Sequence, residues 1–257
     1  MNKLVSINNK AKIGKNLEID NFSSIHEDVE IGDNCWIGSN VTIFPGARIG
    51  SNCKIFPGAV ISAIPQDLKF EGEISTAIVG DNTTLRECVT VNRGTKFSKT
   101  TKIGKNCLLM AYSHVAHDCE IRDNVIIANG VAIAGHVEIE DNAIIGGLSA
   151  IQQFSKIGKF SMVSGGSLVR KNVPPFIKVA KEPLSFIGIN SIGLSRKNYS
   201  REKINEISLM YKVIFQQGNN LSHSLKIIEK NFKNTVEKEE IIKFIDNSKN
   251  GIIKGFY

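Results

Sequence analysis

The sequence predicts a mainly β fold, a parallel β-helix of six-residue repeats followed by a C-terminal α-helical domain. Two observations carry this prediction. An aliphatic residue recurs at every sixth position over most of the first 169 residues, and this rhythm stops after Pro175. In the remainder, apolar residues recur with the spacing of amphipathic helices. We therefore expect residues 1–175 to form the coil and residues 176–257 to form a second, helical domain.

The repeat begins at Ile7 and continues to Val169. Of the 28 positions in this frame, 25 hold Ile, Leu or Val, and the exceptions are Asp67, Glu73 and Phe97. Neither an α-helix nor a flat alternating sheet produces a strict period of six, whereas a solenoid of short parallel strands does. Three six-residue faces complete one triangular coil. Residues eighteen apart are therefore expected to stack about 4.8 Å apart in a parallel ladder.

The three exceptions fall in or beside two stretches that break the repeat, residues 64–77 and 95–102. An insertion can leave a solenoid as a loop without disturbing the stacking of its coils, and such loops often serve a binding face. We therefore predict two excursion loops on an otherwise regular coil.

The C-terminal domain is predicted to contain three helices, over residues 200–217, 221–232 and 235–247. The first has Ser200 as a candidate N-cap and Gly218 as its end. Residues 176–257 hold 14 Lys and Arg against 8 Asp and Glu, a balance of +6, whereas residues 1–175 hold 18 against 17, a balance of +1. The basic surplus of the tail predicts an anionic partner. Charge alone leaves this partner open among nucleic acid, membrane, nucleotide and acidic protein.

Composition limits the function classes. The chain is 42% hydrophobic and 22% charged, as in ordinary globular domains, and it holds no apolar run long enough for a membrane span. Its first residues lack the apolar segment of a secretory signal. The five cysteines form no CxxC pair, and four of them (35, 53, 107 and 119) fall at inward positions of the repeat, where they are interpreted as packing residues. A cytoplasmic protein with reduced cysteines is predicted.

Polar side chains that the repeat does not need gather around residues 117 and 118. Stacking by eighteen residues places His136 above Asp118 and Gly135 above His117, with Gln153 on the next coil of the same column. The spacing predicts an imidazole beside a carboxylate, an open pocket over the imidazole and an exposed backbone N–H at Gly135. A general base with an oxyanion donor requires these groups. The alternative is that they are solvated corner residues.

The histidines also leave a zinc site open as a second interpretation. His114, His117 and His136 lie within 23 residues of one another, and zinc accepts three histidine ligands. The His-x-x-His spacing does not by itself place both rings on one face of a β-coil. The sequence has no Gly-x-Ser-x-Gly elbow and no obvious nucleophilic cysteine. Direct transfer to an acceptor is therefore favoured over a covalent intermediate.

Five segments and the helical tail give a more specific signal than the hexapeptide coil, which acetyltransferases and one carbonic anhydrase class share. The segments are Ile64–Phe70 (IPQDLKF), Arg86–Thr95 (RECVTVNRGT), His114–Cys119 (HVAHDC), Ala134–Val137 (AGHV) and Val173–Pro175 (VPP). With the coil, they resemble the acyl-[acyl-carrier-protein]–UDP-N-acetylglucosamine O-acyltransferase family over essentially the whole chain. That family catalyses the first step of lipid A synthesis.

The resemblance implies a left-handed parallel β-helix and a homotrimer with active sites between neighbouring subunits. It implies that His117 is the general base that takes the proton from the sugar 3-hydroxyl and that Asp118 orients it. His136 would support the site and contact substrate, and the N–H of Gly135 would stabilise the oxyanion. No metal and no other cofactor is implied, because the acyl carrier protein thioester is a co-substrate.

Seven further positions match substrate-binding residues of the family. They are Asp67 and Lys69 in the first excursion, His114 and Gln153 in the pocket, Asn190 and Arg196 beside the nucleotide, and Gly165 at the floor of the acyl slot. A glycine at that floor leaves room for a long acyl chain, and the basic tail would meet the acidic carrier protein. Three positions depart from the common pattern. Asn92 and Gln152 stand where histidine is frequent, and Lys197 stands for a second arginine, without its guanidinium fork.

The predicted function is transfer of a (3-hydroxy)acyl chain from acyl carrier protein to the 3-hydroxyl of UDP-N-acetylglucosamine, in the cytoplasm and without a covalent intermediate. Nucleic acid is not among the predicted partners. The alternatives are an acetyl-CoA-dependent sugar acetyltransferase, a zinc-dependent enzyme of the γ-class carbonic anhydrase type and a non-catalytic scaffold. A 3-amino sugar nucleotide as acceptor also stays open.

Overall fold

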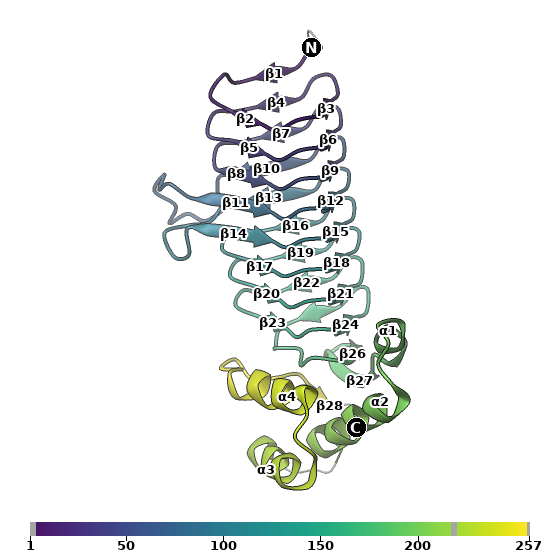
Figure 1. Ribbon diagram of the computed structural model, residues 1–257. Helices are drawn as coiled ribbons and strands as arrows, with labels where there is room; N and C mark the ends of the chain where they lie inside the picture. The colour runs from purple at the N-terminus through teal and green to yellow at the C-terminus, as the bar shows by residue number, and fades with distance from the viewer. Residues whose placement is uncertain (1–3, 217–219, 256–257) are drawn as a thin grey trace.

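The protein, described by a computed structural model over residues 4–216 and 220–255, is a left-handed parallel β-helix with a helical C-terminal region. Figure 1 shows the coils stacked in an upright column, with the helices packed beneath its last turns. Three sheets, whose strands are parallel throughout the regular coils, form the faces of the triangular coil, and we call them the first, second and third sheet. The predicted fold class is confirmed.

Most strands contain only two residues because each face of the coil turns a corner after one inward-pointing aliphatic side chain. The first sheet contains β1 (Ser6–Ile7), β4 (Ser24–Ile25), β7 (Thr42–Ile43), β10 (Val60–Ala63), β13 (Thr90–Asn92), β16 (His114–Val115), β19 (Ala132–Ile133), β22 (Ala150–Ile151) and β25 (Leu168–Val169). The second contains β2 (Lys12–Ile13), β5 (Glu30–Ile31), β8 (Ala47–Ile49), β11 (Thr76–Val79), β14 (Thr100–Ile103), β17 (Glu120–Ile121), β20 (Glu138–Ile139) and β23 (Lys156–Ile157). The third contains β3 (Glu18–Ile19), β6 (Trp36–Ile37), β9 (Lys54–Ile55), β12 (Thr84–Leu85), β15 (Leu108–Leu109), β18 (Ile126–Ile127), β21 (Ile144–Ile145), β24 (Met162–Val163), β26 (Ile177–Ala180), β27 (Ser185–Ile189) and β28 (Lys254–Gly255).

The predicted stacking by eighteen residues is confirmed in the regular coils. His114 pairs with Ala132, and Glu138 pairs with Lys156. The excursions only lengthen the connection, since Val60 pairs with Thr90 thirty residues later. The aliphatic residues of the repeat form one continuous buried core, and the cysteines at 35, 53, 107 and 119 are buried and unpaired within it, as their packing interpretation requires.

The corners of the coil explain the asparagines of the repeat. At the corner between the second and third sheets, seven asparagines adopt a left-handed backbone with φ between 55° and 59°: Asn16, Asn34, Asn52, Asn82, Asn106, Asn124 and Asn142. Asparagine visits this region more readily than other non-glycine residues because its short polar side chain can hydrogen-bond locally. The same conformation recurs at the corner that follows the first sheet, at Asp118, His136 and Phe154. A positive φ is therefore a property of the fold at these three residues.

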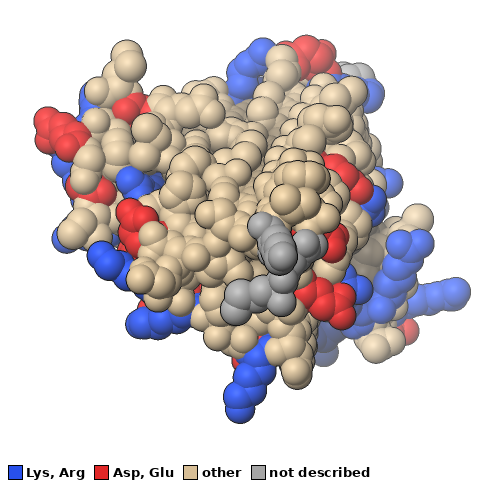
Figure 2. All heavy atoms as spheres, turned by 90° about the horizontal axis from the view of Figure 1, so that it is seen from above, with Lys and Arg blue, Asp and Glu red and all other residues tan. Residues whose placement is uncertain are grey.

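The sides of the coil carry both signs of charge. Lys12 and Glu30 form an ion pair of 2.7 Å between neighbouring strands, and Glu138 and Lys156 form one of 2.9 Å. Figure 2, which looks down from the N-terminal end, shows Lys and Arg side chains and Asp and Glu side chains distributed around the rim. Exposed ion pairs of this kind contribute little to stability.

The three predicted helices are present. They are α2 (Arg201–Phe215), α3 (Leu221–Asn231) and α4 (Val236–Asp246), and Ser200 caps the first as expected. The end predicted at Gly218 lies outside the described residues. The chain does not pass directly from coil to helices, because β26 and β27 extend the third sheet before a short helix, α1 (Ser191–Arg196). In residues 4–216 and 220–255, no helix combines the length and the apolar character of a membrane span.

Candidate active site

Both excursions leave the coil at the same corner, between the first and second sheets. The first joins β10 to β11 and the second joins β13 to β14, and both protrude from one side of the column in Figure 1. The buried Asn92 side chain donates from Nδ2 to the Ile64 carbonyl over 3.1 Å, and Arg93 donates to the Pro45 carbonyl over 3.1 Å. Asn92 therefore fixes the start of the first excursion.

His117 and Asp118 lie at this corner, directly after β16. His117 Nδ1 and Asp118 Oδ2 are 2.7 Å apart. The His117 side chain is only 10% exposed and that of Asp118 is fully buried. Within the described part of the chain, the other ring nitrogen of His117, Nε2, forms no hydrogen bond. The predicted imidazole beside a carboxylate is present.

The Asp118 carboxylate accepts hydrogen bonds on both oxygens from the second excursion. Oδ1 accepts from the N–H of Thr95 over 3.0 Å, the N–H of Ser98 over 3.1 Å and the Ser98 hydroxyl over 2.5 Å. Oδ2 accepts from the Thr95 hydroxyl over 2.6 Å, in addition to His117. Burial disfavours the charged form, but the bonds from Ser98, Thr95 and His117 outweigh it and lower the pKa of Asp118 to about 2. Asp118 is therefore ionised at neutral pH.

The charge of Asp118 fixes the tautomer of His117. An ionised carboxylate only accepts hydrogen bonds, so His117 must carry its proton on Nδ1. Nε2 then has a free lone pair, which is the form in which an imidazole acts as a base.

Gly135 lies against the His117 ring, as the stacking predicts. A Cβ atom at Gly135 would lie 2.6 Å from His117 Cε1 and 2.8 Å from Nε2. Within the described residues, the N–H of Gly135 donates no hydrogen bond. The open pocket expected over the imidazole is not present in the single chain, because Gly135 is buried and the His117 ring occupies the space where its Cβ would lie.

His136 lies on the next coil, within a cluster of aromatic rings. Its Nε2 lies 3.9 Å from Asp118 Oδ2. The Phe154 ring stacks on His136 at 4.5 Å between centroids, and the Phe97 ring meets it edge-on at 4.6 Å. Burial lowers the pKa of His136, although the charges of Asp118 and Asp67 oppose this shift. His136 Nδ1 is buried and has no hydrogen-bond partner in the described structure.

The zinc interpretation required His114 beside His117 and His136, and the structure does not group these three residues. The candidate metal ligands that gather within 4.8 Å of one another are His117, Asp118 and His136. His114, on β16, instead shares a 2.7 Å hydrogen bond between Nδ1 and the Thr90 hydroxyl. Burial, and then the neighbouring His117, lower the pKa of His114.

The other residues assigned to sugar and acyl binding differ in burial and in their place on the coil. Asp67 is half-buried in the first excursion, and its charge acts on His136. Lys69 and Gln153 are exposed. Gly165 lies on a later coil and packs against Gly147. A Cβ atom added at Gly165 would lie 3.1 Å from the Gly147 carbonyl oxygen.

Asn190 and Arg196 lie at a different corner of the coil. Asn190 is buried, donates from Nδ2 to the Phe160 carbonyl over 2.9 Å and caps α1 through Oδ1. Phe160 follows β23 at the corner between the second and third sheets, whereas His117 follows the first sheet. Arg196 is exposed at the end of α1, and Lys197 is its C-cap. Within one chain, these residues are therefore not part of the His117 cluster.

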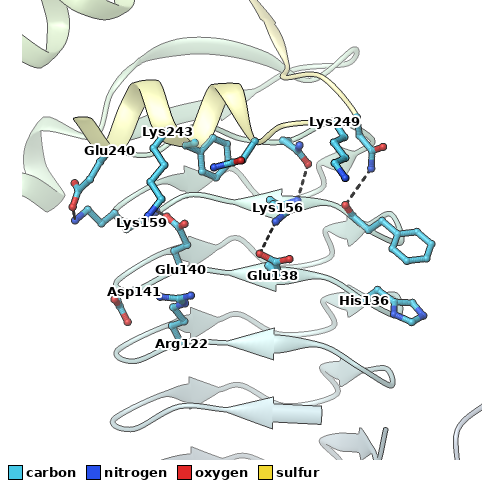
Figure 3. A pocket seen from close by; sticks show the side chains of 15 residues that line it. Arg122, His136, Glu138, Glu140, Asp141, Lys156, Lys159, Glu240, Lys243 and Lys249 are labelled. Atoms are coloured by element: carbon cyan, nitrogen blue, oxygen red, sulfur yellow. Dashed lines mark hydrogen bonds and ion pairs between the residues drawn. The ribbon is translucent and has the colours of Figure 1, made fainter. Parts of the chain in front are cut away.

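A groove of about 810 Å³ lies between the second sheet and α4. Figure 3 shows His136 at one end, Lys156 and Glu138 on the strand side, and Lys243 and Lys249 on the side of α4 and the residues that follow it. The groove connects the edge of the candidate site to the basic C-terminal region.

Sequence reasoning missed Thr95, Ser98, Phe97 and Phe154. Phe154 lies eighteen residues after His136, so the stacking rule contained the signal. The other three lie on the second excursion, where the regular stacking does not apply. The one sequence signal there was Phe97, which stands at a repeat position that usually holds Ile, Leu or Val.

Comparison with known proteins agrees with this architecture. The family model for UDP-N-acetylglucosamine O-acyltransferase domain 2 matches residues 172–253, and the bacterial transferase hexapeptide model matches residues 10–45, 28–63 and 100–135. The chain is similar to acyl-[acyl-carrier-protein]–UDP-N-acetylglucosamine O-acyltransferases from Aliarcobacter butzleri, with 42% identity over 75% of this chain and 74% of the relative, and from Halorhodospira halophila, with 39% identity over 74% of each.

A solved structure shows the same similarity over nearly the full length. The UDP-N-acetylglucosamine acyltransferase from Bacteroides fragilis superposes with a TM-score of 0.98 at 46% identity, covering 99% of this chain and 100% of that one. The enzyme from Francisella novicida gives a TM-score of 0.95 at 35% identity, covering 98% and 93%. The chain belongs to the acyl-[acyl-carrier-protein]–UDP-N-acetylglucosamine O-acyltransferase family.

Proposed function

We propose that this protein transfers a (3-hydroxy)acyl chain from acyl carrier protein to the 3-hydroxyl of UDP-N-acetylglucosamine, the first step of lipid A synthesis. The names of its relatives support the two substrates. The observation that carries the chemistry is the His117–Asp118 pair. Within the described residues, His117 Nε2 forms no hydrogen bond, and it lies against Gly135, whose N–H also donates none.

The proposed reaction is a direct transfer. His117 Nε2 takes the proton of the sugar 3-hydroxyl while the oxygen attacks the thioester carbonyl. The Gly135 N–H donates to the oxyanion that forms on this carbonyl. When the oxyanion collapses, the carbon–sulfur bond breaks, and His117 returns its proton to the departing thiolate of the carrier. Asp118 keeps its charge throughout and stabilises the imidazolium form of His117.

Two aromatic contacts support a positioning and substrate-contacting role for His136. Phe97 and Phe154 hold its ring in place, and its buried Nδ1 has no partner in the described chain. A buried polar atom without a partner is unfavourable unless a ligand satisfies it. A substrate group that bonds to His136 Nδ1 would remove this cost. Asp67, Lys69, His114 and Gln153 complete the proposed binding surface.

The separation of two groups of residues supports an active site shared between subunits of a homotrimer. His117 lies at one corner of the coil, and Asn190 and Arg196 lie near another. If Asn190 and Arg196 contact the nucleotide, they act on the substrate held by a neighbouring subunit. A second subunit would also cover the first sheet, where Ala132, Ala150 and Leu168 are exposed.

The proposed acyl donor is supported by the charge of the C-terminal region and by the room for an acyl chain. The basic surplus of the C-terminal region, including Lys243 and Lys249 in the groove that reaches His136, favours an acidic carrier protein. The absence of side chains at Gly147 and Gly165 leaves room for a long acyl chain. We place the reaction in the cytoplasm, which the five unpaired cysteines support.

The proposed function is tested with purified protein and a mixed pool of acyl carrier protein thioesters. Mass spectrometry is expected to find UDP-N-acetylglucosamine that carries one ester-linked (3-hydroxy)acyl chain, with an unchanged rate after treatment with EDTA. Acylation from acetyl-CoA alone would contradict the proposed donor. Acylation of a 3-amino sugar nucleotide alone would contradict the proposed acceptor. Loss of the reaction with EDTA and its return with zinc would contradict the metal-free mechanism. A trimer in analytical ultracentrifugation is the expected assembly.

A further inference from the structure

The second excursion has a structural role that the stacking of the coil does not explain. Its residues Thr95 and Ser98 direct four hydrogen-bond donors at Asp118, two backbone N–H groups and two hydroxyls. Thr95 is buried, whereas Ser98 is largely exposed. A regular corner of the coil needs no such contacts.

These donors act on the base through Asp118. Of the two carboxylate oxygens, His117 Nδ1 bonds only to Oδ2, and that oxygen can accept a further hydrogen bond. The Thr95 hydroxyl bonds to the same oxygen, while the donors on Oδ1 hold the plane of the carboxylate. Partners of this kind fix both the orientation and the tautomer of the histidine that they support.

We propose that Thr95 and Ser98 are positioning residues for the general base, holding the Asp118 carboxylate so that His117 keeps its proton on Nδ1 and presents Nε2 to the acceptor hydroxyl. The inference rests on the proposed function for its kinetic part. The arrangement gives Thr95 and Ser98 a role in catalysis although neither residue needs to touch substrate. Thr95 has the larger role because water can replace the Ser98 hydroxyl at the surface.

The test replaces Thr95 by Val, which removes the hydroxyl and keeps the shape of the side chain. We expect kcat to fall about 10- to 100-fold, as for other partners that orient a reactive histidine, with KM for both substrates within about twofold of the original. Thr95→Ser, which keeps the hydroxyl, is expected to restore most of the rate. Ser98→Ala is expected to have a smaller effect in the same direction, and Thr95→Val with Ser98→Ala the largest.

A matched control is Thr100→Val in the same excursion. The Thr100 hydroxyl pairs with the Thr76 hydroxyl over 2.8 Å and does not contact Asp118. Its loss is expected to leave kcat unchanged. If Thr95→Val and Thr100→Val lower kcat equally, or if Thr95→Ser is as slow as Thr95→Val, the positioning role is wrong.

A spectroscopic measurement separates this inference from the proposed function. Nitrogen-15 NMR of histidine-labelled protein without substrates should show the His117 proton on Nδ1 in the original chain and a mixture of tautomers in Thr95→Val with Ser98→Ala. An unchanged tautomer together with an unchanged kcat would overturn the inference while leaving the transferase proposal intact. A transfer that fails in the original chain would overturn the proposed function, and the NMR result would still decide the role of Thr95 and Ser98.

Discussion

Replacing His117 by Ala is expected to lower turnover by about 10²–10⁴-fold, the usual loss when a general base is removed. The physical reason is that, in the proposed mechanism, His117 Nε2 takes the proton of the acceptor; this nitrogen lies against Gly135 and forms no hydrogen bond within the described residues. Steady-state kinetics with purified acyl carrier protein thioester and UDP-N-acetylglucosamine measures the effect. The substrate affinities should change much less than kcat, because the base contributes mainly in the transition state.

The matched control is His223→Ala, which removes an exposed imidazole from α3 far along the chain from the site. Its turnover should equal that of the original protein. His117→Ala should keep its thermal transition and its oligomeric state, since the His117 ring belongs to a corner and not to the core. Turnover of His117→Ala within about threefold of the original would refute the assigned role.

Replacing Gly135 by Ala is expected to abolish most activity while the histidine itself is still present. The added Cβ would lie 2.6 Å from His117 Cε1 and 2.8 Å from Nε2, well inside the contact distance. The ring cannot simply rotate away, because Asp118 holds its Nδ1 over 2.7 Å. A displacement of a reacting group by about 1 Å costs about 10²-fold in rate, so kcat should fall by about this factor or more.

Gly104→Ala is the control for Gly135→Ala. Its Cβ would lie 2.6 Å from the backbone carbonyl carbon of Arg122, at the corner between the second and third sheets and away from His117. This variant should lower the thermal midpoint and keep the kcat of the folded protein, whereas Gly135→Ala should lose kcat with a smaller change in thermal midpoint. The same pattern in both variants would contradict the importance of the bare backbone above His117.

The coil could be predicted from the sequence because its determinants are local and periodic. The inward aliphatic positions and the asparagine corners recur at fixed spacing, and eighteen-residue stacking correctly brought His136 beside Asp118 and Gly135 beside His117. The segment between Ile177 and Ile189 was harder to predict. Its strands pair by contacts between distant segments, such as that of β27 with β28, and no periodicity marks such contacts.

The candidate site could be predicted only in part from the eighteen-residue stacking. Stacking arithmetic requires regular coils, and Thr95 and Ser98 belong to an excursion whose path depends on hydrogen bonds to Asp118 and on Asn92 and Arg93 at its base. The burial of Gly135 was also missed, because the spacing gives the column of a residue but not the volume that a neighbouring ring occupies.

The most direct test of His117 as the base compares the pH dependence of kcat/KM in the original protein and in His117→Ala. A reaction that needs an unprotonated base slows toward acid pH. Asp118 does not contribute to this acid limb, since its pKa is about 2. The residual rate of His117→Ala should lack the acid limb of the original. An identical acid limb in both proteins would show that another group takes the proton.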